Sequence, residues 1–117
     1  MIIELTSDSE VLTAIEETDE STPVLLILYA NWCAPFFRIK SAIEQRAQVY
    51  EGQVDFYYVD VDKCLNVAKR FNAGRLPAFY LFWRGVLKTK WNTFSSISDL
   101  GFKRRINSVL REKLWNK

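Results

Sequence analysis

The sequence predicts an α/β fold with the order β-α-β-α-β-α-β-β-α, in which a mixed sheet of about five strands is flanked by four helices. Strand-like and helix-like segments alternate along the chain, which is typical of sheets with parallel strands. Residues 24–30 are apolar without interruption, as in a strand that is buried on both faces. Arg84 and Gly85 separate two later strand-like segments and predict an antiparallel hairpin. The 117 residues fit one domain, residues 1–117.

The first strand and the first helix are predicted near the N-terminus. Residues 2–5 are typical of a short strand. Ser7 and Glu10 have the spacing of a capping box, in which the serine side chain accepts a backbone N–H and the glutamate reaches back to the helix start. We expect this helix to end near Thr18, because the acidic residues that follow are unfavourable at a helix C-terminus.

The second helix is expected to begin at the proline that follows strand 24–30. Pro35 suits the first turn of a helix, where its missing N–H is not needed. Five residues recur at helical spacing and predict the buried face: Phe36, Ile39, Ile43, Ala47 and Tyr50. Phe37 lies off this face, and Gly52 is expected to end the element.

The rest of the chain supplies the remaining elements: strands at 54–61, 78–83 and 86–91, and helices at 63–71 and from residue 99 onward. We expect Asp62 to cap the first of these helices and Gly74 to adopt the left-handed conformation after its end. Ser96 is a second expected cap. The last helix has a predicted apolar face: Phe102, Ile106, Val109, Leu110 and Leu114.

The residue counts exclude several classes of protein. Without histidine, neither a Ser-His-Asp nor a Cys-His catalytic relay nor a histidine-ligated metal site can form. Two cysteines cannot make a disulfide scaffold and are a poor zinc site, so we expect no metal and no cofactor. No apolar run is long enough for a membrane span, and no stacking or groove-reading features indicate nucleic-acid binding. The N-terminus lacks a basic-then-apolar segment, so we expect a cytoplasmic protein.

Cys33 is the candidate reactive residue. It falls between the predicted buried strand and the free N–H groups at the start of the following helix. Those groups and the helix dipole favour the thiolate over the thiol, which would make an accessible Cys33 a nucleophile. The alternative is a buried apolar cysteine with no chemical role.

Several segments in register resemble the thioredoxin family. Residues 26–38 resemble the family's strand, Trp-Cys-Gly-Pro-Cys motif and helix start, residues 58–62 its third strand and exit, residues 74–77 the loop with the cis-proline, and residues 82–85 the following hairpin. The resemblance covers nearly the whole chain. It implies a thioredoxin fold, a nucleophilic Cys33 and a cis-proline at Pro77 that faces Cys33.

Three positions depart from the family pattern. The place of the motif's second cysteine, which resolves the mixed disulfide, is occupied by Phe36. The family's buried aspartate matches Ile27, and the lysine that partners this aspartate matches Phe56. Apolar residues therefore replace the whole apparatus of the second thiol, either by drift after loss of function or by repacking for another task. Both interpretations exclude an ordinary dithiol reductase.

The resemblance also implies a client-binding groove around Cys33. Its expected residues are Trp32, Ala34, Pro35, Leu76 and Asn92. The backbone of Leu76 is expected to pair with an extended client segment. Asn92 stands where the family has glycine and would narrow the groove. Phe37 replaces a solvent-facing lysine and is either part of an apolar contact patch or a lone exposed aromatic.

Two functional hypotheses remain open. In the first, Cys33 forms a mixed disulfide with a protein client or glutathione, and an external thiol completes the exchange. In the second, the fold is a non-catalytic interaction module whose apolar rim, made by Trp32, Phe36, Phe37 and Leu76, binds a protein partner. We expect a monomer, with a Cys33-linked dimer on oxidation. Cys64 is expected to be a buried core thiol without a regulatory disulfide, because its matching partner position is Phe71.

Charge is divided unequally along the chain. Residues 1–62 contain twelve acidic and three basic residues, whereas residues 63–117 contain thirteen basic and two acidic residues. In a thioredoxin-like fold the acidic first helix would lie beside the helix that carries Lys63, Lys69 and Arg70. The hairpin and the last helix would then form a basic side, without acidic neighbours, that attracts an acidic partner.

Overall fold

The computed structural model describes residues 2–16, 22–92 and 99–115. The predicted order of elements is confirmed: β1 (Ile3–Leu5), α1 (Asp8–Glu16), β2 (Val24–Tyr29), α2 (Ala34–Val49), β3 (Asp55–Asp60), α3 (Leu65–Phe71), β4 (Ala78–Trp83), β5 (Val86–Trp91) and α4 (Asp99–Trp115). The predicted end of the first helix at Thr18 and the predicted cap of the last helix at Ser96 lie outside the described residues.

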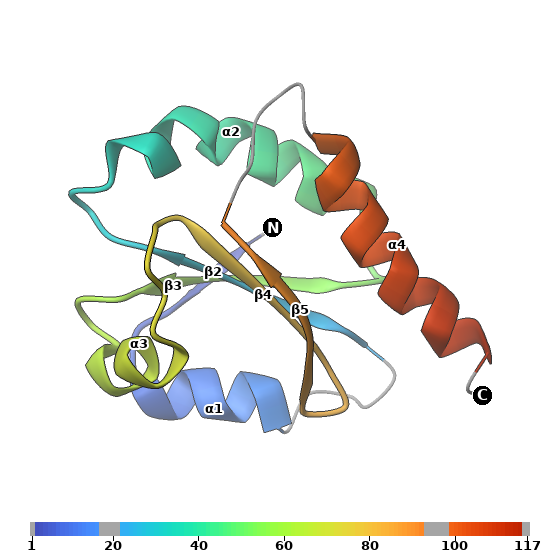
Figure 1. The fold of residues 1–117 in the computed structure, drawn as a ribbon, viewed down its shortest axis with the longest axis horizontal. Helices are drawn as coiled ribbons and strands as arrows, with labels where there is room; N and C mark the ends of the chain where they lie inside the picture. Colours follow the sequence, from blue (N-terminus) through green and yellow to red (C-terminus); the bar gives the residue numbers. More distant parts are fainter. Residues whose placement is uncertain (1, 17–21, 93–98, 116–117) are drawn as a thin grey trace.

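The five strands form one mixed sheet in the order β1-β3-β2-β4-β5. β1, β3 and β2 run parallel, whereas β4 is antiparallel to both β2 and β5. α2 and α4 cover one face of the sheet, and α1 and α3 cover the other (Figure 1). β2 lies in the middle, and all six of its residues are buried, as its apolar run predicts.

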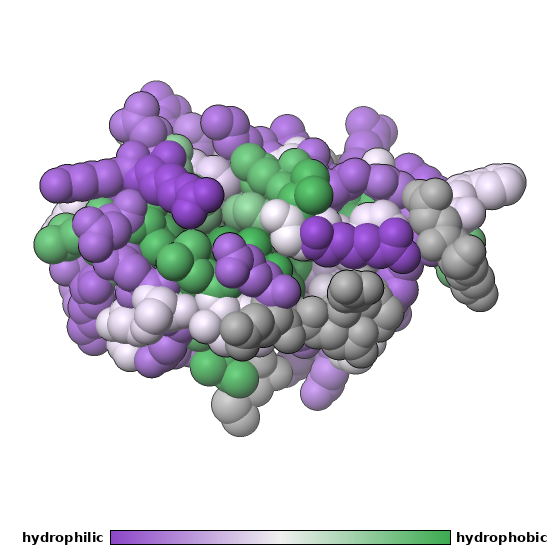
Figure 2. Space-filling view, turned by 90° about the horizontal axis from the view of Figure 1, so that it is seen from below, coloured by the Kyte–Doolittle hydropathy of each residue, from purple (hydrophilic) through white to green (hydrophobic). Residues whose placement is uncertain are grey.

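The central strand divides its side chains between two apolar cores, because successive side chains of a strand point to opposite faces. Leu25, Ile27 and Tyr29 belong to the core under α2 and α4. Val24, Leu26 and Leu28 belong to the core under α1 and α3. Seen from the α1 and α3 side, apolar patches lie between hydrophilic side chains (Figure 2).

The capping box of α1 forms with one change of partner. The backbone N–H of Glu10 donates to Ser7 Oγ at 3.2 Å, as predicted. The Glu10 carboxylate, however, accepts from the backbone N–H of Thr6 at 3.2 Å and from the Thr6 hydroxyl at 3.3 Å, one residue before the expected Ser7 N–H. The glutamate therefore fixes the connection between β1 and α1.

The predicted caps of α3 are wrong at both ends. Cys64, not Asp62, is the N-cap residue, and it makes no side-chain capping bond. Asp8 of α1 supplies the cap instead, because its carboxylate accepts from the backbone N–H groups of Val67 at 3.0 Å and Asn66 at 3.4 Å. At the other end Asn72, rather than Gly74, takes the left-handed conformation, with φ 50° and ψ 49°. Asparagine tolerates this region better than most residues.

The hairpin and last helix follow the prediction closely. Arg84 and Gly85 both have positive φ, 55° and 76°, as a two-residue hairpin turn of the I′ type requires. Phe102, Ile106 and Val109 of α4 are buried. Leu114, the last residue of the predicted apolar face, does not pack into the core, since it is 65% exposed.

Candidate functional site

Cys33 lies in the short connection between β2 and α2. Its backbone N–H donates to the Ala30 carbonyl at 2.9 Å, and its own carbonyl accepts from the Phe36 N–H at 3.1 Å. It is the N-cap residue of α2, without a side-chain capping bond. The residue is only 4% exposed, so the expectation of an openly accessible cysteine is wrong. Its small exposed surface lines a groove from which a reactant can approach the sulfur.

This groove has a volume of about 470 Å³. Trp32, Cys33 and Pro35 line one side of it, Val61 and Ala68 lie near the entry to α3, and residues 73–76 complete the wall. The Leu76–Pro77 peptide bond is cis. The structure thus brings together four of the residues singled out from the sequence: Trp32, Cys33, Pro35 and Leu76.

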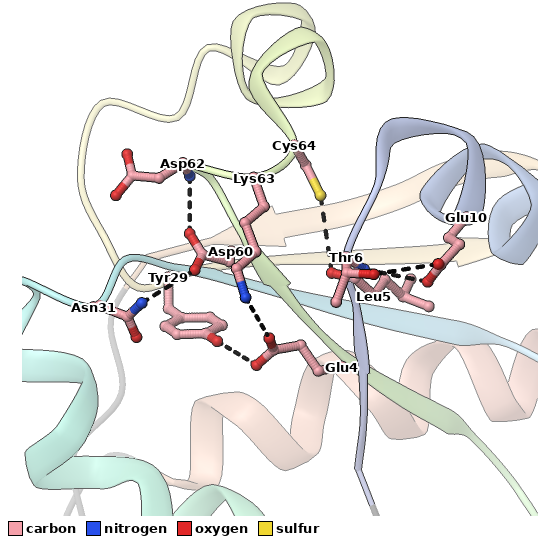
Figure 3. Close-up of polar contacts among 10 residues, drawn as sticks. All are labelled: Glu4, Leu5, Thr6, Glu10, Tyr29, Asn31, Asp60, Asp62, Lys63 and Cys64. Atoms are coloured by element: carbon pink, nitrogen blue, oxygen red, sulfur yellow. Dashed lines mark hydrogen bonds and ion pairs between the residues drawn. The ribbon is translucent and has the colours of Figure 1, made fainter.

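The loop beside Cys33 is held by a carboxylate that the sequence analysis missed. Asp60, at the end of β3, is 1% exposed. Its two oxygens accept from the Asp62 backbone N–H at 2.9 Å and from Asn31 Nδ2 at 3.3 Å (Figure 3). Asp62 in turn accepts from Trp32 Nε1 at 3.1 Å. Asp60 therefore links the two loops that flank Cys33, and the signal for it was an acid at the end of an apolar strand.

Position 36 is filled by a buried ring. Phe36 is 1% exposed and stacks on Tyr29, with ring centroids 4.5 Å apart and 23° between the planes. It also meets Tyr58 edge to face at 5.5 Å. Such aromatic pairs add about 0.5–1.5 kcal/mol to the free energy of burial. Phe36 is thus part of the core, and the groove contains no second thiol among the residues that line it.

The strand register corrects one assignment made from the sequence. Ile27 is paired with Tyr58 on β3, whereas Phe56 is paired with Leu25. The lysine that partners the family's buried aspartate therefore corresponds to Tyr58, not to Phe56. The error arose because alternate residues of a strand share a face, so a shift of two residues keeps the apolar pattern.

Two tyrosines beside Phe36 donate to carboxylates. The Tyr58 hydroxyl donates to Glu44 Oε1 at 3.2 Å, and burial, together with Glu44, raises the pKa of Tyr58 well above its usual range. The Tyr29 hydroxyl donates to Glu4, which also pairs with Lys63 at 3.7 Å (Figure 3). Burial and then Glu4 raise the pKa of Tyr29 in the same way. Both phenols stay protonated donors and cannot replace the missing acid–base pair at neutral pH.

The other predicted groove residues lie elsewhere. Phe37 is 46% exposed and meets the rings of Phe36 and Tyr29 edge to face, and neither it nor Ala34 is among the residues that line the Cys33 groove. Asn92 lines a second hollow of about 270 Å³, which shares the segment 73–75 with the first. The expected rim of four apolar residues is therefore wrong at Phe36, which is buried, whereas Phe37 is exposed as expected but lies outside the lining of this groove.

Cys64 is fully buried, as predicted, and its thiol donates to the Leu5 carbonyl at 3.8 Å (Figure 3). Burial first, and then the nearby carboxylates led by Asp8, raises the pKa of the Cys64 thiol to about 11. Both cysteines are free thiols. Phe71, at the position of a possible pairing cysteine, stacks on Tyr80 at 4.8 Å.

The residues that the structure describes contain neither a metal-binding cluster nor a helix that could span a membrane. Residues 2–16, 22–92 and 99–115 contain no group of three or more histidine, cysteine, aspartate or glutamate side chains arranged to hold a metal ion. None of the helices in this part of the chain combines the length and the apolar composition of a bilayer span.

Known proteins similar to this chain include several thioredoxins. Thioredoxin C-2 of Corynebacterium nephridii is 37% identical over 57% of this chain and 62% of its own length. Thioredoxin 1 of Chlorobaculum tepidum is 33% identical over 64% of this chain and 72% of its own length. The match covers less than two thirds of several curated relatives, including 42% of the chloroplastic thioredoxin M4 of Arabidopsis thaliana.

Solved structures give the same result. Plasmodium falciparum thioredoxin has a TM-score of 0.79 and 25% identity, over 92% of this chain and 98% of that one. Mitochondrial thioredoxin 3 of Saccharomyces cerevisiae has a TM-score of 0.75 and 25% identity, over 92% and 94%. The family model for thioredoxin matches residues 3–101. The chain belongs to the thioredoxin family.

Proposed function

We propose that this chain is a monothiol thiol–disulfide exchange protein in which Cys33 is the only exchanging thiol. The observation that carries the proposal is the contrast between positions 33 and 36. Cys33 lines a groove at the start of α2 as a free thiol, whereas Phe36 is a buried ring stacked on Tyr29. The nucleophile of the family is therefore present, and the resolving thiol is replaced by part of the core.

The proposed exchange takes two steps. The Cys33 thiolate attacks one sulfur of a client disulfide, a new S–S bond joins Cys33 to that sulfur, and the other client sulfur leaves as a thiolate. An external thiolate, such as glutathione, then attacks the client sulfur of the mixed disulfide and releases the Cys33 thiolate. Over the two steps the client disulfide is exchanged for a disulfide between the client and the external thiol. Cys33 returns to its thiolate form, so the protein is neither oxidised nor reduced overall.

The proposal is tested by following disulfide exchange with glutathione present. The substrate is bis(2-hydroxyethyl) disulfide, and oxidised glutathione is measured through glutathione reductase and NADPH. We expect turnover by the natural chain, a mixed disulfide between Cys33 and the 2-mercaptoethanol half of the substrate in mass spectra, and loss of both in Cys33→Ser. Turnover that persists in Cys33→Ser, or its absence in the natural chain, contradicts the proposal.

The second candidate is a non-catalytic interaction module, and one observation favours it: Trp32 is 70% exposed at the mouth of a groove whose cysteine is 4% exposed. A module binds its partner equally well with Cys33→Ser and loses it with Trp32→Ala. Phe37→Lys serves as the control, because Phe37 does not line the groove. A cytoplasmic location, a monomeric state and the use of glutathione stay predictions.

A further inference from the structure

A second hollow lies beside the groove that holds Cys33. The two share Ala73, Gly74 and Arg75 as a common wall, and their volumes are about 470 and 270 Å³. The second hollow extends past this wall to the ends of α3 and β5, where Asn72, Lys90 and Asn92 line it. A client segment that extends from Cys33 across this shared wall would contact both hollows.

The second hollow is basic. Arg75 and Lys90 both line it and are exposed, and none of the described residues that line it is acidic. From position 72 to position 92 the sequence contains four basic residues and no acidic residue. The other two of these basic residues have partners: Arg84 lies over the Trp83 ring of the hairpin at 4.5 Å, and Lys88 pairs with Glu112 of α4 at 2.6 Å.

The opposite flank of Cys33 has the opposite charge. Trp32 Nε1 donates to the Asp62 carboxylate at 3.1 Å, and the Asp60 carboxylate is buried behind it. The groove therefore runs from an acidic flank at Asp62 to a basic flank at Arg75 and Lys90. Such a gradient orients a charged segment in one direction and disfavours the reverse direction.

We infer that this protein selects protein clients that have acidic residues on one side of their reactive cysteine, close enough along the sequence to reach Arg75 and Lys90. The inference rests on the proposed function and adds the chemical class of the client to it. Arg75 lines both the groove and the basic hollow, so a client segment that delivers its sulfur to Cys33 passes beside this side chain. Charges at the rim of such a site act mainly on the rate of association.

The test uses pairs of eight-residue peptides with one cysteine each, activated as a disulfide with nitrothiobenzoate. Cys33 attacks the peptide sulfur, the Cys33–peptide disulfide forms, and nitrothiobenzoate leaves as a coloured thiolate while the Cys33 proton goes to solvent. One peptide of each pair has two glutamates beside the cysteine, and the other has two lysines at the same positions. In one pair the charged residues precede the cysteine, and in the other pair they follow it. At low ionic strength we expect the faster of the two acidic peptides to react about tenfold faster than the lysine peptide of its pair. The difference should be smaller in 0.5 M salt, because the screening length there is roughly 4 Å.

Variants assign the preference to the basic hollow. Arg75→Glu combined with Lys90→Glu should reverse it. The matched control is Arg104→Glu combined with Arg111→Glu, which makes the same charge change on exposed positions of α4 and should keep it. If circular dichroism shows that the first variant does not fold, Arg75→Gln with Lys90→Gln should abolish the preference without reversing it.

Equal rates for both peptides, or a preference that survives in the Arg75 and Lys90 variants, overturns the inference. A preference for glutathione over every peptide does so as well. Failure of the proposed function has a different signature, in which no peptide releases nitrothiobenzoate. In that case tryptophan fluorescence of Cys33→Ser with the reduced peptides decides the charge question, since tighter binding of the acidic peptide supports the basic hollow and equal binding refutes it.

Discussion

The two cysteines of this protein occupy similar places in the backbone and very different surroundings. Cys33 and Cys64 are the N-cap residues of α2 and α3, both are buried, and neither makes a side-chain capping bond. Cys33 lines a groove, whereas Cys64 donates to the Leu5 carbonyl and is surrounded by carboxylates. A helix N-terminus alone is therefore no sign of a reactive thiol, because access and neighbouring charge decide its chemistry.

The largest expected effect is a difference in alkylation rate between the two thiols. With a pKa of about 11, roughly one Cys64 in a thousand is a thiolate at pH 8, and it lies beneath β1. We expect iodoacetamide to label Cys33 at least about a hundredfold faster than Cys64, because the raised pKa lowers the thiolate fraction of Cys64 about a hundredfold and Cys33 lines an open groove. Mass spectrometry of the single-thiol variants Cys64→Ala and Cys33→Ser measures each rate. Comparable rates in the two variants would remove the contrast between the sites.

The second prediction concerns Phe36, whose ring occupies the position of the family's second cysteine. Phe36→Cys deletes a buried aromatic side chain and should lower the free energy of unfolding by about 3 kcal/mol. Phe37→Cys is the matched control, because Phe37 is half exposed and its loss should cost below about 1 kcal/mol. Urea denaturation under reducing conditions measures both. A loss at position 36 no larger than at position 37 would show that the core does not depend on Phe36.

The sequence was sufficient for the fold because its strongest signals are local and redundant. The apolar run 24–30, the hairpin turn at Arg84 and Gly85 and the stripe of α2 each identify an element without knowledge of the others. The caps of α3 could not be found in this way. Asp8 is far from α3 along the chain and reaches it only after α1 and α3 pack together.

The site was predicted less completely for the same reason. Trp32, Cys33, Pro35 and Leu76 were identified from motifs, and the structure places them around one groove. Asp60 and Arg75 were missed, because their roles depend on which loops the sheet brings together. The expected basic side is also smaller than the sequence suggested, since Lys88 pairs with Glu112 of α4.

The third prediction uses the raised pKa of Cys64. The folded chain holds this proton more tightly than the unfolded chain, in which the pKa is near its ordinary value of 9.0. The stability that this group contributes is therefore complete below pH 9 and is lost as the pH rises to about 11. Relative to Cys64→Ala, the natural chain should lose on the order of 2 kcal/mol over this interval. Parallel curves of unfolding free energy against pH would contradict the assignment.

The smallest expected effect comes from Asp8, which affects both the helix that begins after Cys64 and the Cys64 thiol itself. Its carboxylate caps α3 and also raises the pKa of Cys64. Asp8→Ala should therefore cost about 1 kcal/mol of stability, and it should speed the alkylation of Cys64 by lowering that pKa. Asp8→Asn separates the two effects, because the amide oxygen can still accept from the Val67 N–H while the charge is gone. Faster labelling with retained stability in Asp8→Asn is expected from charge acting on the thiol. If labelling accelerates only in Asp8→Ala, local opening of α3, and not charge, controls access to Cys64.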